Sequence, residues 1–287
     1  MKMRNILLTF LLLPFLVACG SGSRSSPSSA GGQAGQISAV VQEEVTVQSP
    51  NGQIWGEVFR PDDSKRHPIM IYSHGLGSSY RYGEDYGQAL AQQGYVVYTF
   101  DFYGGSYSGR SGGQMTDMTV FTEVADLNAV IDQMKQQSYV DGDNVFLMGA
   151  SQGGVVSSLT ASSRDDIRGL LLNYPAFVLR DDMREMFSSV SAVPDTFSLM
   201  GMTLGGDYAR SVLDVDLMGE ATRYTGPVLI LHGTSDSTAP ISYSEDAVTR
   251  FANARLISLD GVGHSFSGDT LNRSIQETET FLADNLG

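Results

Sequence analysis

Cysteine is almost absent from this sequence of 287 residues, in which Cys19 is the only one. A single cysteine excludes an internal disulfide and a cysteine cluster that could hold a metal. Histidine is also scarce, and the four histidines include no His-Glu-x-x-His motif. We therefore expect no metal and no cofactor.

Basic residues are few as well. The chain has 18 Lys and Arg against 32 Asp and Glu, a formal net charge of -14 at pH 7. Proteins that bind nucleic acids usually present basic patches to the phosphate backbone, so this balance argues against a nucleic-acid partner. The hydrophobic content of 41% is enough to fill a sizeable core.

The longest apolar run lies at the start of the chain. Lys2 and Arg4 precede ILLTFLLLPFLVAC, a run too short for a comfortable membrane span. A basic start, a short apolar core and a small residue at Ala18 are typical of a secretory signal peptide. The ending LVAC also resembles a bacterial lipobox, which implies lipidation of Cys19 and predicts that residues 1–19 are a lipoprotein signal peptide. An ordinary secretory signal with an incidental cysteine is the alternative.

The segment that follows is rich in glycine and serine. Residues 20–36, GSGSRSSPSSAGGQAGQ, cannot build a core and predict a flexible tether. With a lipid on Cys19, the protein would reach the membrane of the bacterial cell envelope only through that anchor. No aspartate stands just after Cys19, which in this resemblance implies the outer membrane.

From residue 37 onward, short apolar runs alternate with segments of helical periodicity. Strands rich in Val, Ile and Leu that alternate with helices indicate an α/β fold with a mostly parallel sheet and helices on both faces. Strands are expected at 38–48, 54–60, 67–75, 95–102, 144–150, 167–175, 226–233 and 254–261, and helices at 85–94, 120–137, 153–163, 241–251 and 271–286.

One connection in this order is long. Residues 176–225 separate two predicted strands, and structureless loops longer than about 12 to 15 residues are uncommon in compact domains. We expect an inserted cap with its own elements. RDDMREMFSS has a helical pattern, and FSLMGMTL resembles a strand.

Two serines stand in a Gly-x-Ser-x-Gly motif. A nucleophilic serine in this motif needs a sharp turn between a buried strand and a helix. Ser151 follows the apolar run NVFLMGA and precedes a predicted helix, whereas Ser111 lies between two loop segments. The context therefore favours Ser151 as the nucleophile and a loop role for Ser111.

A serine nucleophile needs a histidine base and an acid that orients the base. In folds of this kind the chain order is serine, acid, histidine, and only His232 and His264 follow Ser151. His232 ends a predicted strand, so His264, in the loop after the last strand, is the predicted base. Asp236 lies between the two in a loop after a strand and is the predicted acid.

The tetrahedral intermediate of acyl transfer carries an oxyanion that needs two donors. One is expected to be the backbone N–H of the residue after the nucleophile, Gln152. The other should come from the loop after the third strand, SHGLG, in which the N–H of Leu76 is the predicted donor. His74 is expected to shape that loop rather than to take part in the chemistry.

With these residues in place, residues 37–287 resemble the α/β-hydrolase superfamily. HGLG, DFYGGSYSG, SQGGVVSSL, HGTSD and, within the cap, TLGGDYAR are similar to the bacterial cinnamoyl or feruloyl esterases. That resemblance implies that Asp182 and Tyr208 of the cap bind the hydroxyl groups of a phenolic ring. A helix-surface charge for Asp182 and cap packing for Tyr208 are the alternatives. The chain departs from that family at Ala150 and Leu76, where histidine and phenylalanine are usual.

The sequence thus predicts a serine esterase acting on a small-molecule ester, with hydroxycinnamoyl (feruloyl or p-coumaroyl) esters of plant cell-wall material as the expected substrates. A general carboxylesterase, a lipase-like enzyme or an aminopeptidase-type hydrolase of the same fold is the first alternative. A tethered binding protein without activity is the second, because a fold alone does not establish a function.

Overall fold

The computed structural model describes residues 39–287. The predicted signal peptide, the lipidation of Cys19 and the tether over residues 20–36 lie outside the described residues. Within residues 39–287, no helix is long and apolar enough to cross a membrane, and no cluster of His, Cys, Asp or Glu could hold a metal ion.

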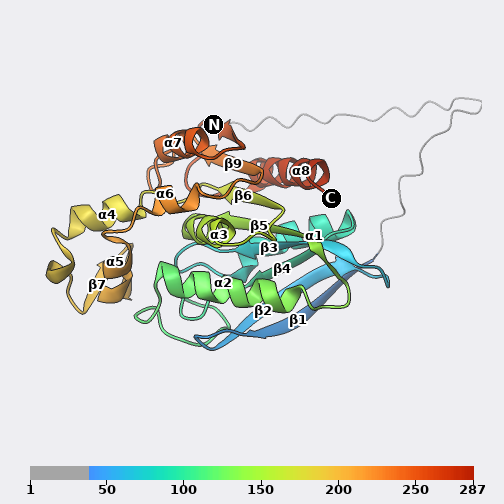
Figure 1. Ribbon diagram of the computed structural model, residues 1–287, viewed down its shortest axis with the longest axis horizontal. Coiled ribbons are helices and arrows are strands. Elements are labelled where there is room, and N and C mark those ends of the chain that lie inside the picture. Colours follow the sequence, from blue (N-terminus) through green and yellow to red (C-terminus); the bar gives the residue numbers. More distant parts are fainter. Residues whose placement is uncertain (1–38) are drawn as a thin grey trace, which may run out of the picture. The chain divides into compact units, whose positions relative to one another are not determined.

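An eight-stranded sheet forms the centre of this part of the chain (Figure 1). The strand order is β1-β2-β4-β3-β5-β6-β9-β10, and all pairs after β4 are parallel, whereas β2 is antiparallel to both β1 and β4. The predicted α/β class with a mostly parallel sheet is confirmed. The strands are β1 Val40–Gln48, β2 Gln53–Pro61, β3 His67–Ser73, β4 Val96–Phe100, β5 Val140–Ala150, β6 Gly169–Asn173, β9 Val228–Gly233 and β10 Ala254–Leu259.

Helices cover both faces of the sheet, because the strands are apolar on both sides. In β5, Val145 and Leu147 join the core beneath α2 and α3, while Phe146 and Met148 join the core beneath α1 and α8. Figure 1 shows α2 and α3 side by side in front of the sheet. The helices that flank the sheet are α1 Glu84–Gln92, α2 Val120–Met134, α3 Gln152–Ser162, α7 Ser242–Arg250 and α8 Gly268–Asp284.

The segment between β6 and β9 forms its own group of elements, drawn in yellow and light orange in Figure 1. Its hairpin turns at Met200 and Gly201, which both have positive φ, and this turn divides the single predicted strand FSLMGMTL into two. The elements are α4 Leu179–Met186, the 3-10 helix Val190–Ala192, β7 Thr196–Leu199, β8 Met202–Gly205, α5 Gly206–Val212 and α6 Leu217–Ala221.

The parallel register brings the carboxyl ends of the central strands to one edge. Ser73 of β3 pairs with Gly149 of β5, and Asn173 of β6 pairs with both Ala150 of β5 and Leu231 of β9. Loops that follow these strands therefore emerge side by side, which is where ligands bind in open α/β sheets.

Candidate active site

Ser151 occupies a sharp turn between β5 and α3. Its backbone has φ 53° and ψ -121°, a conformation that non-glycine residues rarely adopt and that costs of order 1 to 3 kcal/mol. A Cβ at Gly149 would overlap the carbonyl of Gly153, and a Cβ at Gly153 would overlap the carbonyl groups of Ser73 and His74. The two glycines are therefore what lets the strand and the helix approach closely enough to lift the serine out of the sheet.

A line of hydrogen bonds joins Ser151 to two residues far along the chain. His264 Nε2 lies 2.9 Å from Ser151 Oγ, and His264 Nδ1 lies 2.7 Å from Asp236 Oδ2. Because Nδ1–H donates to the carboxylate, Nε2 is free to accept the proton of the serine hydroxyl. The structure thus brings the predicted nucleophile, base and acid together at the carboxyl edge of the sheet.

The carboxylate of Asp236 is buried and held by several donors. The N–H groups of Thr238 and Ala239 each donate to its Oδ1 at 2.9 Å. Burial acts to raise the pKa of Asp236, but the hydrogen bonds from Ala239 and His264 outweigh it, and the pKa falls below the ordinary carboxyl value. The carboxylate is therefore ionised at neutral pH, as an acceptor for His264 Nδ1–H must be.

A second histidine contacts the same carboxylate, and sequence reasoning missed this contact. His232 Nε2 lies 3.1 Å from Asp236 Oδ2 and 2.7 Å from the carbonyl oxygen of Ala239. Since both partners are acceptors, Nε2 carries the proton, and Nδ1 accepts from the hydroxyl of Ser244 at 2.7 Å. Burial lowers the pKa of His232, so the ring is neutral and acts as a fixed donor to Asp236.

Tyr174 supports the other side of His264 and was also missed. Its ring meets His264 edge-on with centroids 4.9 Å apart, and it packs in the same way against Phe266 at 4.8 Å. Tyr174 directly follows β6 and has φ 39°, so a turn after the strand aims the ring at the histidine. A tyrosine at a strand end gives no sequence signal for this role.

The residues predicted to supply the oxyanion donors, Leu76 and Gln152, both lie next to Ser151. Gln152 begins α3, so its N–H has no partner within the helix, as at any helix start. Gly75 lies so close that a Cβ there would be 3.0 Å from Ser151 Cβ, which places Leu76 beside Ser151. Leu76, Ser151 and Gln152 all line one cavity.

His74 fixes the loop that carries Leu76. Its Nδ1–H donates to the carbonyl of Gly75 at 2.8 Å, its Nε2 accepts from Phe102 N–H at 3.2 Å, and Ser106 Oγ lies 3.0 Å from the same Nε2. Burial lowers the pKa of His74, which keeps Nε2 an acceptor. The ring therefore ties the loop after β3 to the loop after β4.

Ser111, the other motif serine, lies in a loop. Its Oγ–H donates to the carbonyl of Asp101 at 2.6 Å, and its Oγ accepts from Trp55 N–H at 2.8 Å. Both functions of the hydroxyl are occupied by backbone groups. Ser111 thus joins a loop to β2, and no histidine contacts its oxygen among the described residues.

Two cavities meet at Ser151. The larger, about 370 Å³, is mostly apolar and extends under the cap, where Asp182 and Glu185 are its two carboxylates. The smaller, about 160 Å³, contains His264 and Tyr174. Burial raises the pKa of Asp182, and the charges of Glu185 and Asp181 raise it further. Asp182 therefore lies where a ligand hydroxyl could reach it.

Tyr208 is not placed where the resemblance puts it. Its side chain is completely buried and does not line the cavity, and its hydroxyl donates to Gln152 Oε1 at 2.7 Å. The contact between Tyr208 and a phenolic ring that the resemblance implies is therefore not supported by this structure. Gln152, and not Tyr208, lines the cavity, and it accepts the hydrogen bond from the Tyr208 hydroxyl.

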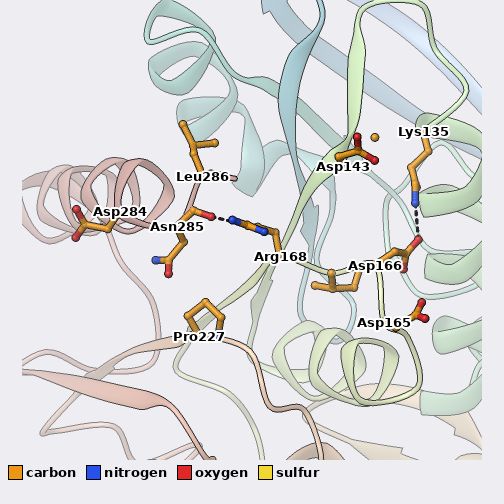
Figure 2. A pocket seen from close by; sticks show the side chains of 11 residues that line it. Lys135, Asp143, Asp165, Asp166, Arg168, Pro227, Asp284, Asn285 and Leu286 are labelled. Atoms are coloured by element: carbon orange, nitrogen blue, oxygen red, sulfur yellow. Dashed lines mark hydrogen bonds and ion pairs between the residues drawn. The ribbon is translucent and has the colours of Figure 1, made fainter.

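Another concave region lies at the opposite edge of the sheet, at the amino ends of the strands (Figure 2). There Lys135 Nζ lies 2.6 Å from Asp166 Oδ2, and Arg168 Nε donates to the carbonyl of Asn285 at 2.8 Å. The second contact joins the end of α8 to the start of β6. The residues that line this region include no serine, cysteine or histidine that could act as a nucleophile or a base.

Two family models match the chain. The model described as serine aminopeptidase, S33, matches residues 64–205, and the model described as TAP-like protein matches residues 211–285. The first span contains Ser151, and the second contains Asp236 and His264.

Among solved structures, Est1E from Butyrivibrio proteoclasticus with bound ferulic acid is similar, with a TM-score of 0.76 and 24% identity, over 84% of this chain and 98% of that one. The acetyl xylan esterase from Paenibacillus sp. R4 has a TM-score of 0.68 and 17% identity, over 88% and 87% of the two chains. At these identities the likeness shows the α/β-hydrolase fold.

A curated relative with an assigned activity is the caffeoylshikimate esterase of Arabidopsis thaliana. It is 28% identical over 141 residues, which are 48% of this chain and 42% of that protein. The uncharacterized protein YcjY of Escherichia coli is 31% identical over 94 residues, 32% of this chain and 30% of that one. The matches therefore span less than half the length of these relatives.

Proposed function

We propose that this chain, which has the α/β-hydrolase fold, is a serine esterase in which Ser151, His264 and Asp236 form the catalytic triad. The observation that carries the proposal is the unbroken hydrogen-bonded line from Ser151 Oγ through the His264 ring to Asp236, at 2.9 and 2.7 Å. These distances lie within the range over which a base can take a proton from a hydroxyl.

The reaction begins when Ser151 Oγ attacks the ester carbonyl carbon and His264 Nε2 takes the hydroxyl proton. Asp236 stabilises the imidazolium that forms and holds the ring in its productive tautomer. The tetrahedral intermediate collapses to an acyl-enzyme when the alcohol leaves with the proton from His264. Water then attacks the acyl-enzyme by the same steps, and the carboxylic acid is released.

The intermediate's negative oxygen would be stabilised by the backbone N–H groups of Leu76 and Gln152. Loss of one such donor typically costs about 2.7 to 4 kcal/mol of transition-state stabilisation. The alcohol must leave next to His264, which lines the smaller cavity. The acyl group then occupies the larger cavity beneath the cap.

The shape and polarity of the larger cavity support hydroxycinnamoyl esters as substrates. A flat apolar acyl chain suits its apolar wall, and Asp182, which lines the same cavity, offers an acceptor to a ring hydroxyl. An acceptor left without a partner penalises analogues that lack the hydroxyl. The ferulic acid held by Est1E and the name of the caffeoylshikimate esterase are consistent with this substrate class.

A substrate panel tests the proposal. We expect turnover of methyl ferulate and methyl p-coumarate and labelling of Ser151 by a fluorophosphonate probe, with both lost in Ser151→Ala and retained in Ser111→Ala. Cleavage of p-nitrophenyl acetate without turnover of either phenolic ester would refute the substrate class and leave the mechanism standing. Absence of labelling would instead indicate an inactive binding protein.

The same panel separates the other activities of this fold. Lipid esters test a lipase-like enzyme, and peptide amides test the aminopeptidase activity named by the matched family model. An amide substrate cleaved faster than every ester would replace the esterase proposal.

We also propose that the enzyme is a lipoprotein attached through Cys19 to the bacterial cell envelope, on the outer membrane. The lipobox-like LVAC sequence supports this. Labelled palmitate incorporated by the wild type but not by Cys19→Ser would agree with it, and equal labelling of the two would contradict it.

A further inference from the structure

Three buried polar side chains from distant parts of the chain form a continuous run behind the nucleophile. Tyr208 Oη–H, from α5 of the cap, donates to Gln152 Oε1 at 2.7 Å. Gln152 Nε2–H donates to Glu123 Oε2, on α2, at 2.8 Å. All three side chains are at least 99% buried. Both ends of the Gln152 amide are thus held, one by the cap and one by the body of the domain.

Buried polar side chains are a risk to stability in an apolar core. Any one of them left without a hydrogen-bond partner costs about 1 to 3 kcal/mol. Burial also raises the pKa of Glu123 well above its ordinary value, against the opposing effect of the Gln152 hydrogen bond. Burial therefore favours the neutral acid form of Glu123, and its Oε1 has no partner among the described residues. Packing alone would favour an apolar residue there.

Gln152 links these buried hydrogen bonds to the proposed oxyanion site. Its own backbone N–H is one of the two proposed oxyanion donors, and the peptide that carries it follows directly from the strained backbone of Ser151. A strained conformation persists only where its surroundings over-determine it. The Gln152 side-chain amide is hydrogen-bonded through both its oxygen and its nitrogen, and it supplies that restraint one residue after the strained Ser151.

We propose that Tyr208 and Glu123 are positioning residues that hold Gln152, and with it the N–H of Gln152, in the orientation the oxyanion requires. The inference rests on the proposed esterase function. It gives the cap a direct link to the catalytic centre, because displacement of α5 would remove the donor to Gln152 Oε1. Preorganised donors stabilise the transition state without reorganisation at the moment of reaction.

Kinetics of Tyr208→Phe on methyl ferulate, methyl cinnamate and p-nitrophenyl acetate test the inference. We expect kcat to fall about 10-fold on all three with KM unchanged, less than the 100- to 1,000-fold loss typical when a donor is removed outright. Binding of phenylboronic acid, whose tetrahedral adduct places an oxygen in the same site, should weaken by the same factor. Tyr224→Phe is the matched control, because Tyr224 is also buried and its hydroxyl donates to the carbonyl of Ile167 at 3.1 Å, away from the site.

The second variant pair examines Glu123. Glu123→Gln keeps a carbonyl acceptor for Gln152 Nε2 and should retain kcat, whereas Glu123→Met removes the acceptor and should lower kcat as Tyr208→Phe does. A Tyr208→Phe defect confined to methyl ferulate would show contact with the ring hydroxyl and overturn the inference. Kinetics that match those of Tyr224→Phe would also overturn it while the esterase function stands. A wild type inactive on all three esters would overturn both.

Discussion

At the scale of single residues, the acid of the proposed triad is hydrogen-bonded by groups outside its own loop as well as within it. Asp236 accepts from two backbone N–H groups and from the rings of His264 and His232. Hydrogen bonds to an ionised group are roughly twice as strong as those between neutral groups. The neutral His232 ring therefore stabilises the carboxylate and fixes the oxygen that receives His264 Nδ1–H.

We predict that His232→Phe lowers kcat about 10-fold without a matching rise in KM, because Asp236 Oδ2 loses a fixed donor and can rotate away from His264. Steady-state kinetics on the preferred ester measure this. Ser244→Ala, which removes only the partner of His232 Nδ1, serves as the control and should have a smaller effect. An unchanged kcat in His232→Phe would mean that the backbone donors alone hold Asp236.

At the scale of elements, the position of the proposed nucleophile depends on how closely one strand and one helix approach. β5 and α3 meet at Ser151, and the loop after β3 lies against both. The contacts at Gly153 are with backbone carbonyl groups, which cannot move aside as a flexible side chain could. The glycines are therefore a requirement of the element packing as much as of the serine's conformation.

Gly153→Ala should consequently destabilise the fold by about 1 to 3 kcal/mol or more, the usual cost of forcing extra atoms into a packed core. Urea unfolding of the purified variant measures the loss. Gly263→Ala is a matched control, because a Cβ there meets nothing within 4 Å and its φ is not positive. Equal stability of the two variants would argue against the packing described for the turn.

At the scale of the whole molecule, burial of an acid makes stability depend on pH. The pKa of Glu123 is raised in the folded chain, whereas an unfolded glutamate titrates near 4.3. Its contribution to stability is therefore fully present below about pH 4.3 and is lost as pH rises through the folded value, because only the unfolded chain ionises in between.

Glu123→Gln lacks this titration, so its stability relative to the wild type should increase from pH 5 to pH 8. The difference should grow by about 1.4 kcal/mol for each pH unit over which only the unfolded glutamate is ionised. Urea unfolding at the two pH values checks this, with the exposed Glu245→Gln as control. A difference independent of pH would mean that Glu123 is ionised in the fold.

Local patterns in the sequence were sufficient to predict much of this architecture. Alternating apolar runs and helical segments predicted the parallel sheet, and the strand-turn-helix context separated Ser151 from Ser111. The chain order predicted Asp236 and His264, which the structure brings into hydrogen-bond contact. Each of these inferences uses residues whose meaning depends on near neighbours or on the order of strands.

Tertiary structure alone decided which side chains support those residues. Nothing near His232 in the sequence shows that its ring turns toward Asp236, and nothing near Tyr208 shows that Gln152 rather than the cavity receives its hydroxyl. Glu123, Gln152 and Tyr208 lie on α2, α3 and α5, and only the packing of these helices brings their polar groups together. The reason is physical: backbone propensity and hydrophobic periodicity act locally, whereas the partner of a buried polar group is chosen by whichever distant element closes over it.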